Sequence, residues 1–231
     1  MSNQLFIIIT TWIDIFAAVF TAIIGFIRYK RIPIYGKSLL WMIISACIST
    51  NLLSYLQDNK FSTIPLLYVT YFLDFIFISI FFNYSLPVFK KKRAGIFIML
   101  AGILFLILNT IFYVPVGEAK NYFGFYYYQS FYSLCAIVFS ILGMYLLFQK
   151  QTWKEIKKNP VFWFFLTIAF SEGIGFFNGI MLPMVGDDEL SKHKIFYNIL
   201  SFIFDWLPGD LAYIVFGILF LYYPKKPGPV E

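Results

Sequence analysis

Five carboxylic acids lie inside stretches of the sequence that otherwise hold mostly apolar residues: Asp14, Asp74, Glu172, Asp205 and Asp210. At about 1.5 Å of helix per residue, four of them fall near the middle of their stretches, and Asp205 lies somewhat outward. A charged carboxylate at the centre of a bilayer costs about 2.5 to 3.5 kcal/mol on insertion scales. Because no Lys or Arg lies deep in these stretches, each acid must hold a proton or find a cation, a polar side chain or a ligand.

Polar side chains accompany two of these acids at helical spacing. Asn198, Ser201 and Asp205 stand at i, i+3 and i+7, which places them on one face of a helix. Tyr71 precedes Asp74 by three residues and shares its face in the same way. The two stripes predict polar faces directed toward the interior of a helical bundle. A single acid capped by a hydroxyl can also be purely structural.

A third acid lies in the segment SEGIGFFNG, residues 171–179. Glu172 is followed by Gly175 and Gly179, a four-residue spacing of small residues that permits close approach of two helices. Asn178 adds a further hydrogen-bond donor. The same glycine spacing could pack two helices of one chain or two copies of the chain, so a homo-oligomer is an open alternative.

The pair Pro208-Gly209 interrupts an apolar stretch just before Asp210. Proline removes a backbone N–H and frees a carbonyl one turn earlier, and glycine relaxes the backbone, so we expect a kink or an unwound hinge here. Irregular backbone at membrane depth is tolerated where it lines protein or water. The sequence therefore predicts a polar cavity, with Asp74, Glu172, Asp205, Asp210, Asn178, Asn198, Ser201 and Tyr71 binding a proton or ligand beside this hinge.

Most catalytic chemistries are absent from the sequence. The single histidine, His193, falls in a loop, which excludes zinc hydrolases that need several histidine ligands. Nucleotide-binding glycine loops are also missing. Pro208-Gly209-Asp210 resembles the Gly-x-Gly-Asp signature of intramembrane aspartyl proteases, although Leu207 replaces the first glycine. We expect a non-catalytic protein without cofactor or metal, and keep an aspartyl protease as an alternative.

Seven apolar stretches are long enough to cross a bilayer as helices. With 60% hydrophobic and 13% charged residues, the composition is that of a membrane protein rather than a soluble one. The loops are too short for a soluble domain. The fold class we predict is all-α, one polytopic domain over residues 1–231. Its predicted helices span about 5–27, 38–56, 65–86, 94–114, 126–148, 161–181 and 195–223.

Basic residues gather in every second connection between these stretches. The positive-inside rule therefore places the N-terminus outside and the C-terminus in the cytoplasm. The Lys and Arg residues cluster at the ends of the apolar stretches. They do not lie along one face with aromatic residues that could stack on bases, so we expect no nucleic-acid partner. The residues on the predicted cytoplasmic side are Arg28, Lys30, Arg31, Lys37, Lys90, Lys91, Lys92, Arg93, Lys150, Lys154, Lys157, Lys158, Lys225 and Lys226.

Three pairs of stretches resemble one another, for example AAVFTAI (17–23) and AIVFSIL (136–142), or YFLDF (71–75) and FIFDW (202–206). The pairing predicts a parallel 3+1+3 repeat. This plan resembles that of the seven-helix sugar and PQ-loop transporters. No Pro-Gln pair occurs in the sequence, so the resemblance covers architecture alone.

A second resemblance covers most of the chain. The sequences of segments 35–56, 66–82 and 159–177 resemble those of an uncharacterised seven-helix family common in Bacteroidota. Members of that family often stand beside membrane-tethered sensor kinases, which implies a sensory or accessory role, a membrane kinase as partner and a bacterial inner membrane location. We therefore expect a sensory module whose carboxylate pocket binds a proton, cation or small ligand. The alternatives are a small proton- or cation-coupled transporter and a structural subunit of a membrane complex.

Overall fold

The computed structural model describes residues 3–113, 118–181, 203 and 207–223, and its regular elements are helices. No strand occurs in these ranges, so the prediction of an all-α chain is confirmed for them. The helices are α1 (Asn3–Ile27), α2 (Ile34–Asp58), α3 (Ile64–Ser85), α4 (Pro87–Lys92), α5 (Ala94–Tyr113), α6 (Glu118–Lys150), α7 (Trp153–Ile156), α8 (Pro160–Met181) and α11 (Leu207–Tyr222).

Five of these helices are long and apolar enough to cross a membrane. They carry spans at Ile34–Leu53, Ile64–Ser85, Ala94–Phe112, Tyr126–Lys150 and Pro160–Phe177. The apolar stretches of α1 and α11 are shorter, at Trp12–Ile27 and Leu207–Tyr222. Large apolar side chains are exposed along the outside of the bundle, as lipid contact requires. The chain is thus a multi-pass membrane protein.

Some helices extend further than the apolar stretches of the sequence. Helix α2 begins at Ile34, four residues before the expected start, and α6 begins at Glu118, eight residues before it. Hydropathy marks the part of a helix that fits the hydrocarbon, and the backbone hydrogen bonds continue beyond that part. Helix α11 begins at Leu207, and the earlier part of the expected segment, 195–202, lies outside the described residues.

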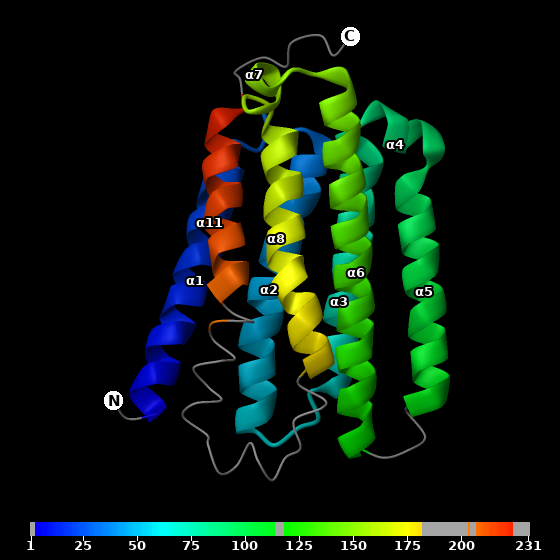
Figure 1. Cartoon of the computed structure of the whole chain (residues 1–231). Helices are drawn as coiled ribbons and strands as arrows, with labels where there is room; N and C mark the ends of the chain where they lie inside the picture. Colours follow the sequence, from blue (N-terminus) through cyan, green and yellow to red (C-terminus); the bar gives the residue numbers. More distant parts are fainter. Residues whose placement is uncertain (1–2, 114–117, 182–202, 204–206, 224–231) are drawn as a thin grey trace.

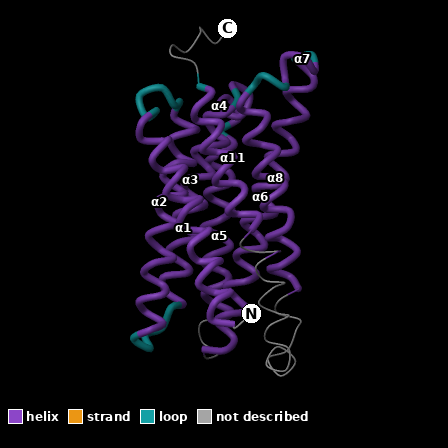
Figure 2. The backbone as a smooth tube through the Cα atoms, turned by 90° about the vertical axis from the view of Figure 1, so that its left-hand side faces the viewer, coloured by secondary structure: helices purple, strands orange, loops and turns teal. Residues whose placement is uncertain are grey.

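The long helices run side by side along one axis (Figures 1 and 2). Following the contacts around the bundle, α1, α2, α3, α6, α8 and α11 form a ring that closes where α11 packs on α1. Helix α5 packs outside this ring, against α3 and α6. The short helices α4 and α7, which carry basic residues, lie at the same end of the bundle as the end of α11 (Figure 1).

A buried aromatic layer fills the ring at the end near α4 and α7. Its members lie two to six residues from the helix ends there, and neighbouring ring centroids are 5.1 to 6.1 Å apart, within the range of favourable aromatic pairs. We define the aromatic layer as Phe81, Phe82, Phe164, Phe165, Phe216 and Phe220.

Glycine allows α6 to approach α8 beside this layer. A Cβ atom at Gly143 would lie 2.4 Å from the ring of Phe165, so no larger residue fits without displacing the ring. At Gly175, where the sequence predicts close approach, a Cβ atom would lie 3.6 Å from Ser133 Oγ, an ordinary contact. Within the described residues, the close α6–α8 packing therefore depends on Gly143 rather than on Gly175.

Candidate functional site

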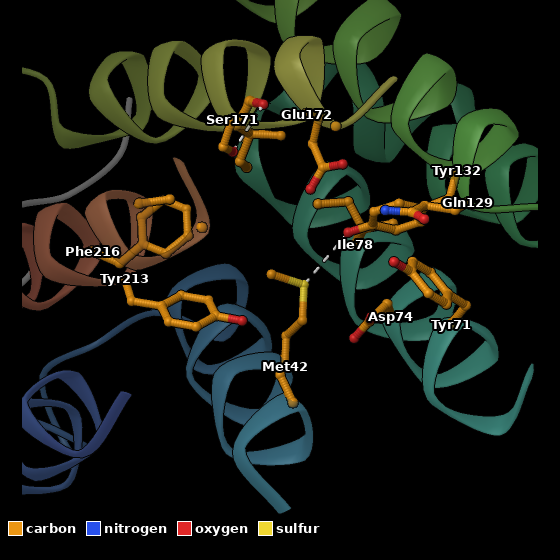
Figure 3. A pocket seen from close by; sticks show the side chains of 15 residues that line it. Met42, Tyr71, Asp74, Ile78, Gln129, Tyr132, Ser171, Glu172, Tyr213 and Phe216 are labelled. Carbon is orange, nitrogen blue, oxygen red and sulfur yellow. Dashed lines mark hydrogen bonds between the residues drawn. The ribbon is translucent and has the colours of Figure 1, made fainter. Parts of the chain in front are cut away.

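A polar cavity of about 180 Å³ lies in the middle of the helical ring. Its described walls come from α2, α3, α6, α8 and α11, and the side chains of Asp74, Glu172 and Tyr213 point into it (Figure 3). This volume holds several water molecules or a small polar molecule. Phe216 belongs both to the cavity wall and to the aromatic layer, so the aromatic layer adjoins the cavity on the side of the end that carries α4 and α7.

Helix α3 supplies two of the predicted site residues, Asp74 and Tyr71. Both line the cavity together with Ile78, because residues three or four apart share one face of a helix. Phe75, which follows Asp74 in the chain, does not line the cavity: it is 1% exposed and packs against Tyr128 and Tyr132. The Oδ1 atom of Asp74 is buried and has no hydrogen-bond partner among the described residues.

Helix α8 supplies Glu172, which lies opposite α6. The hydroxyl of Ser133 donates a hydrogen bond of 2.7 Å to Oε2 of Glu172. Glu172 is also close enough to Asp74 for their charges to interact. None of the described residues that line the cavity is Lys or Arg. Two acids therefore share a cavity whose described walls offer no positive charge.

Two tyrosines complete the polar wall. Tyr132 is 4% exposed, and its hydroxyl donates to the sulfur of Met42 at 3.7 Å. Tyr213 comes from α11 and lies within electrostatic range of both Asp74 and Glu172. Because the face of an aromatic ring is electronegative, rings and carboxylates together favour a cationic guest.

A second pair of acids connects α1 to α11. Asp210 is 2% exposed, and its carboxyl group is within hydrogen-bonding reach of the carboxyl group of Asp14. An ionised carboxylate only accepts hydrogen bonds, so the pair can form this bond only when one of the two acids holds a proton. Oδ2 of Asp210 is buried and has no hydrogen-bond partner among the described residues.

A hydrogen bond further along the two helices also fixes the α1–α11 contact. Thr21 Oγ1 donates to the backbone carbonyl of Tyr213 at 2.5 Å. A Cβ atom at Gly217 would lie 3.0 Å from the same Thr21 oxygen, so the two helices are in close contact here. Tyr213 thus belongs both to the cavity wall and to the helix contact that holds the Asp14–Asp210 pair.

Four of the described acids lie at one depth. Asp74, Glu172, Asp210 and Asp14 are 11 to 13 residues from the ends of their helices near α4 and α7. At 1.5 Å per residue this corresponds to about 16 to 20 Å, roughly half the hydrocarbon thickness or a little more. The acids occupy one layer but separate into two pairs, with Asp74 and Glu172 in the cavity and Asp14 and Asp210 beside it.

The hinge predicted at Pro208-Gly209 falls at a helix start. Pro208 is the second residue of α11, where its missing N–H breaks no hydrogen bond within the helix, and Gly209 lines the cavity. The residues before it, 204–206, lie outside the described residues, so the hinge itself stays a prediction. The predicted site residues Asn198, Ser201 and Asp205 also lie outside them, as does the side chain of Asn178, whose backbone belongs to α8.

Several cavity residues were missed by the sequence interpretation. Gln129 and Tyr132 stand three residues apart on α6, with Ser133 next to Tyr132, and together they form a polar stripe in an apolar helix. Tyr213 follows Asp210 by three residues. The spacing rule that selected Tyr71 would have selected these residues as well.

Comparison with known proteins yields no relative: no family model, curated protein or solved structure matches the chain. Among the described residues, no group of three or more His, Cys, Asp or Glu side chains is arranged to hold a metal ion. The cavity and its acids are therefore the features of the described structure that indicate a function.

Proposed function

We propose that the protein binds a proton or a small organic cation in its central cavity and acts as a sensory or accessory module of a bacterial inner membrane. The observation that carries the proposal is the buried, unpartnered Oδ1 of Asp74 beside Glu172, in a cavity whose described walls hold no Lys or Arg. Buried acids without cationic neighbours at membrane depth mark proton or ligand sites by default.

The occupant is chosen by the chemistry of the wall. Two carboxyl groups supply up to two negative charges, and Tyr71, Tyr132 and Tyr213 line the same cavity, where an aromatic ring can attract a cation. A protonated amine of a few heavy atoms satisfies both and fits the volume of about 180 Å³. When no cation is bound, protons neutralise the acids, so the cation and the protons compete for the same oxygens.

A signal can leave the cavity through α11. Tyr213 contacts the cavity on one side, and its backbone carbonyl accepts the hydrogen bond of Thr21 on α1 on the other. A cation that moves Tyr213 would therefore alter the α1–α11 contact and the neighbouring Asp14–Asp210 pair. A small bias between two packings of α11 is sufficient for signalling.

We place seven spans in the membrane by adding α1 and α11 to the five longer helices, with the N-terminus outside and the ends near α4 and α7 in the cytoplasm. The basic residues of α4 and of the α7 segment support this orientation. The resemblance to a family found beside sensor kinases makes a membrane kinase the partner of first choice.

A proton- or cation-coupled transporter is the second candidate. The observation that favours it is the aromatic layer, which separates a mid-depth cavity from one end of the bundle, as a closed gate would in one state of an alternating-access cycle. In that function the layer has to open, whereas in a sensory module it stays closed.

The two functions are separated by flux measurements on purified protein in liposomes. Methylammonium, a small cation, serves as the probe, and a proton gradient is imposed across the membrane. A sensory module binds methylammonium without carrying it, and its binding disappears in Asp74→Asn. Gradient-driven uptake that is abolished by the same substitution would establish transport. The absence of both binding and uptake would refute a cation site in this cavity.

A further inference from the structure

A second cavity lies on the outside of the bundle, where α8 and α11 pack together near α7. Its volume is about 530 Å³, and it is lined by residues of the α7–α8 connection, of the start of α8 and of α11. Figure 1 shows these two helices side by side, with α7 at their end. We call this cavity the α8–α11 groove; its members used below are Lys157, Lys158, Trp163, Ile218, Leu219 and Tyr222.

The chemistry of the groove changes along the helix axis. Lys157 and Lys158 are exposed at the end of the bundle. Ile218 lies four residues before Tyr222, the last residue of α11, and is therefore about 6 Å deeper along the helix. Positive charge thus stands at the level of lipid headgroups, and apolar surface stands at the level of acyl chains.

Two aromatic residues mark the boundary between these levels. Trp163 and Tyr222 are 37% and 77% exposed, as expected of residues at a membrane interface. The indole Nε1 of Trp163 donates a hydrogen bond of 2.9 Å to the backbone carbonyl of Lys157. This bond holds the backbone of Lys157 beside the groove, and the backbone N–H of Lys158 donates to the carbonyl of Glu155 at 3.0 Å.

We propose that the α8–α11 groove is a binding site for an anionic phospholipid. Lys157 and Lys158 contact the phosphate and headgroup, and an acyl chain lies along Ile218 and Leu219. The described lining of the groove includes two lysines and no acid, so charge complementarity selects an anionic lipid over a zwitterionic one. An outward groove lined by Ile218, 41% exposed, is filled by lipid in a bilayer.

The site is independent of the central cavity, because no residue lines both. It lies on the outer side of α11, the helix that contributes Tyr213 to the central cavity. A bound lipid therefore links the composition of the membrane to the helix that carries the proposed signal.

Native mass spectrometry of the full chain tests this site, with phosphatidylglycerol and phosphatidylcholine of identical acyl chains as probes. We expect phosphatidylglycerol to be retained more strongly. The double substitution Lys157→Gln with Lys158→Gln should weaken its retention roughly 10- to 30-fold, as expected for two lysines near a lipid surface. The substitution Ile218→Trp should reduce retention of the same lipid with every charge intact, because the indole fills the acyl level.

The matched control is Lys91→Gln with Lys92→Gln, which removes two exposed charges from α4 at the same end of the bundle. We expect this control to leave retention unchanged, and an equal loss in both double variants would overturn a specific site. Displacement of the lipid by millimolar inorganic phosphate would overturn the acyl contact. If the double lysine variant does not fold, the Ile218→Trp variant tests the site by itself. Unchanged retention of phosphatidylglycerol by Ile218→Trp would contradict the proposal.

Discussion

Ser133 Oγ on α6 donates a hydrogen bond of 2.7 Å to Oε2 of Glu172 on α8. Ser133 is 1% exposed, so its hydroxyl group is shielded from bulk solvent. The contact joins two helices directly at the wall of the central cavity and directs one carboxyl oxygen of Glu172 toward α6. The Ser133 hydroxyl therefore helps to set the orientation of Glu172, and with it the arrangement of charge in the cavity.

Replacement of Ser133 by alanine tests this dependence. We expect Ser133→Ala to lower the free energy of unfolding by about 1 to 2 kcal/mol, because a buried carboxyl group loses a donor. The substitution should also weaken binding of a cation in the cavity. The control is Ser130→Ala on the same helix, since the Ser130 hydroxyl binds the carbonyl of Tyr126 within α6. Thermal unfolding in detergent measures both variants, and equal stability of the two would contradict the role given to Ser133.

The effect of a substitution at Asp14 on stability should depend on whether the new side chain can donate a hydrogen bond to Asp210. Asp14→Asn keeps a donor for Asp210 and should be tolerated, because the amide replaces the protonated acid. Asp14→Ala removes the partner of a side chain that is 2% exposed and should cost about 1 to 3 kcal/mol. Thermal unfolding distinguishes the two substitutions. An alanine variant as stable as the asparagine variant would show that the two acids do not depend on each other.

Close packing of α6 on α8 can be tested with two glycines. Gly143→Ala places a Cβ atom 2.4 Å from the Phe165 ring and should destabilise the protein by about 1 to 3 kcal/mol through overpacking. Gly173→Ala meets no atom within 4 Å and should be neutral or stabilising, because alanine favours helix. Unfolding temperatures of both variants give the answer. The opposite order would mean that Gly143 does not limit the helix approach.

The short helix α7 should respond to acid. The carboxylate of Glu155 accepts hydrogen bonds from Thr152 N–H and Oγ1 at 2.8 and 2.9 Å, which lower the pKa of Glu155 from its ordinary value of 4.5. Since the folded-state pKa lies below that of the unfolded chain, these bonds are fully present above pH 4.5 and are lost as the pH falls through the lowered value. Helix α7 should therefore open locally in acid.

Amide hydrogen exchange at Thr152 detects this opening. We expect its protection to fall as the pH drops below 4.5, after correction for intrinsic exchange. In Glu155→Gln the protection should be weaker at neutral pH and should not change further with acid. Protection of the wild-type amide that is the same above and below the transition would contradict the role of the Glu155 carboxylate.

Much of the architecture is readable from the sequence because the bilayer allows few solutions. Apolar stretches must become helices, and a fixed rise per residue sets the depth of each acid. The common depth of Asp14, Asp74, Glu172 and Asp210 follows from these two facts alone. The ends of helices are less predictable, since α6 continues into polar residues where hydropathy gives no information.

The order of the helices around the ring determines which acids are neighbours. The spacing of residues within one helix does not reveal that order. Asp14 is not among the site residues predicted from the sequence. In the structure, Asp14 has Asp210 as its neighbour because the ring closes with α11 on α1. One pattern does point to this contact. Ala17, Ala18 and Thr21 follow Asp14 at helical spacing and are all buried, as small residues at a helix interface are.

The most direct test of the central claim measures methylammonium binding and proton release together. Purified protein in weakly buffered detergent solution is titrated with methylammonium while heat and pH are recorded, alongside Asp74→Asn, Glu172→Gln and the exposed control Glu155→Gln. We predict saturable binding with release of protons in the wild type and in the control, and loss of both in the two cavity variants. Binding that persists unchanged in Asp74→Asn and Glu172→Gln, or no binding by the wild type, would contradict a cation site at these acids.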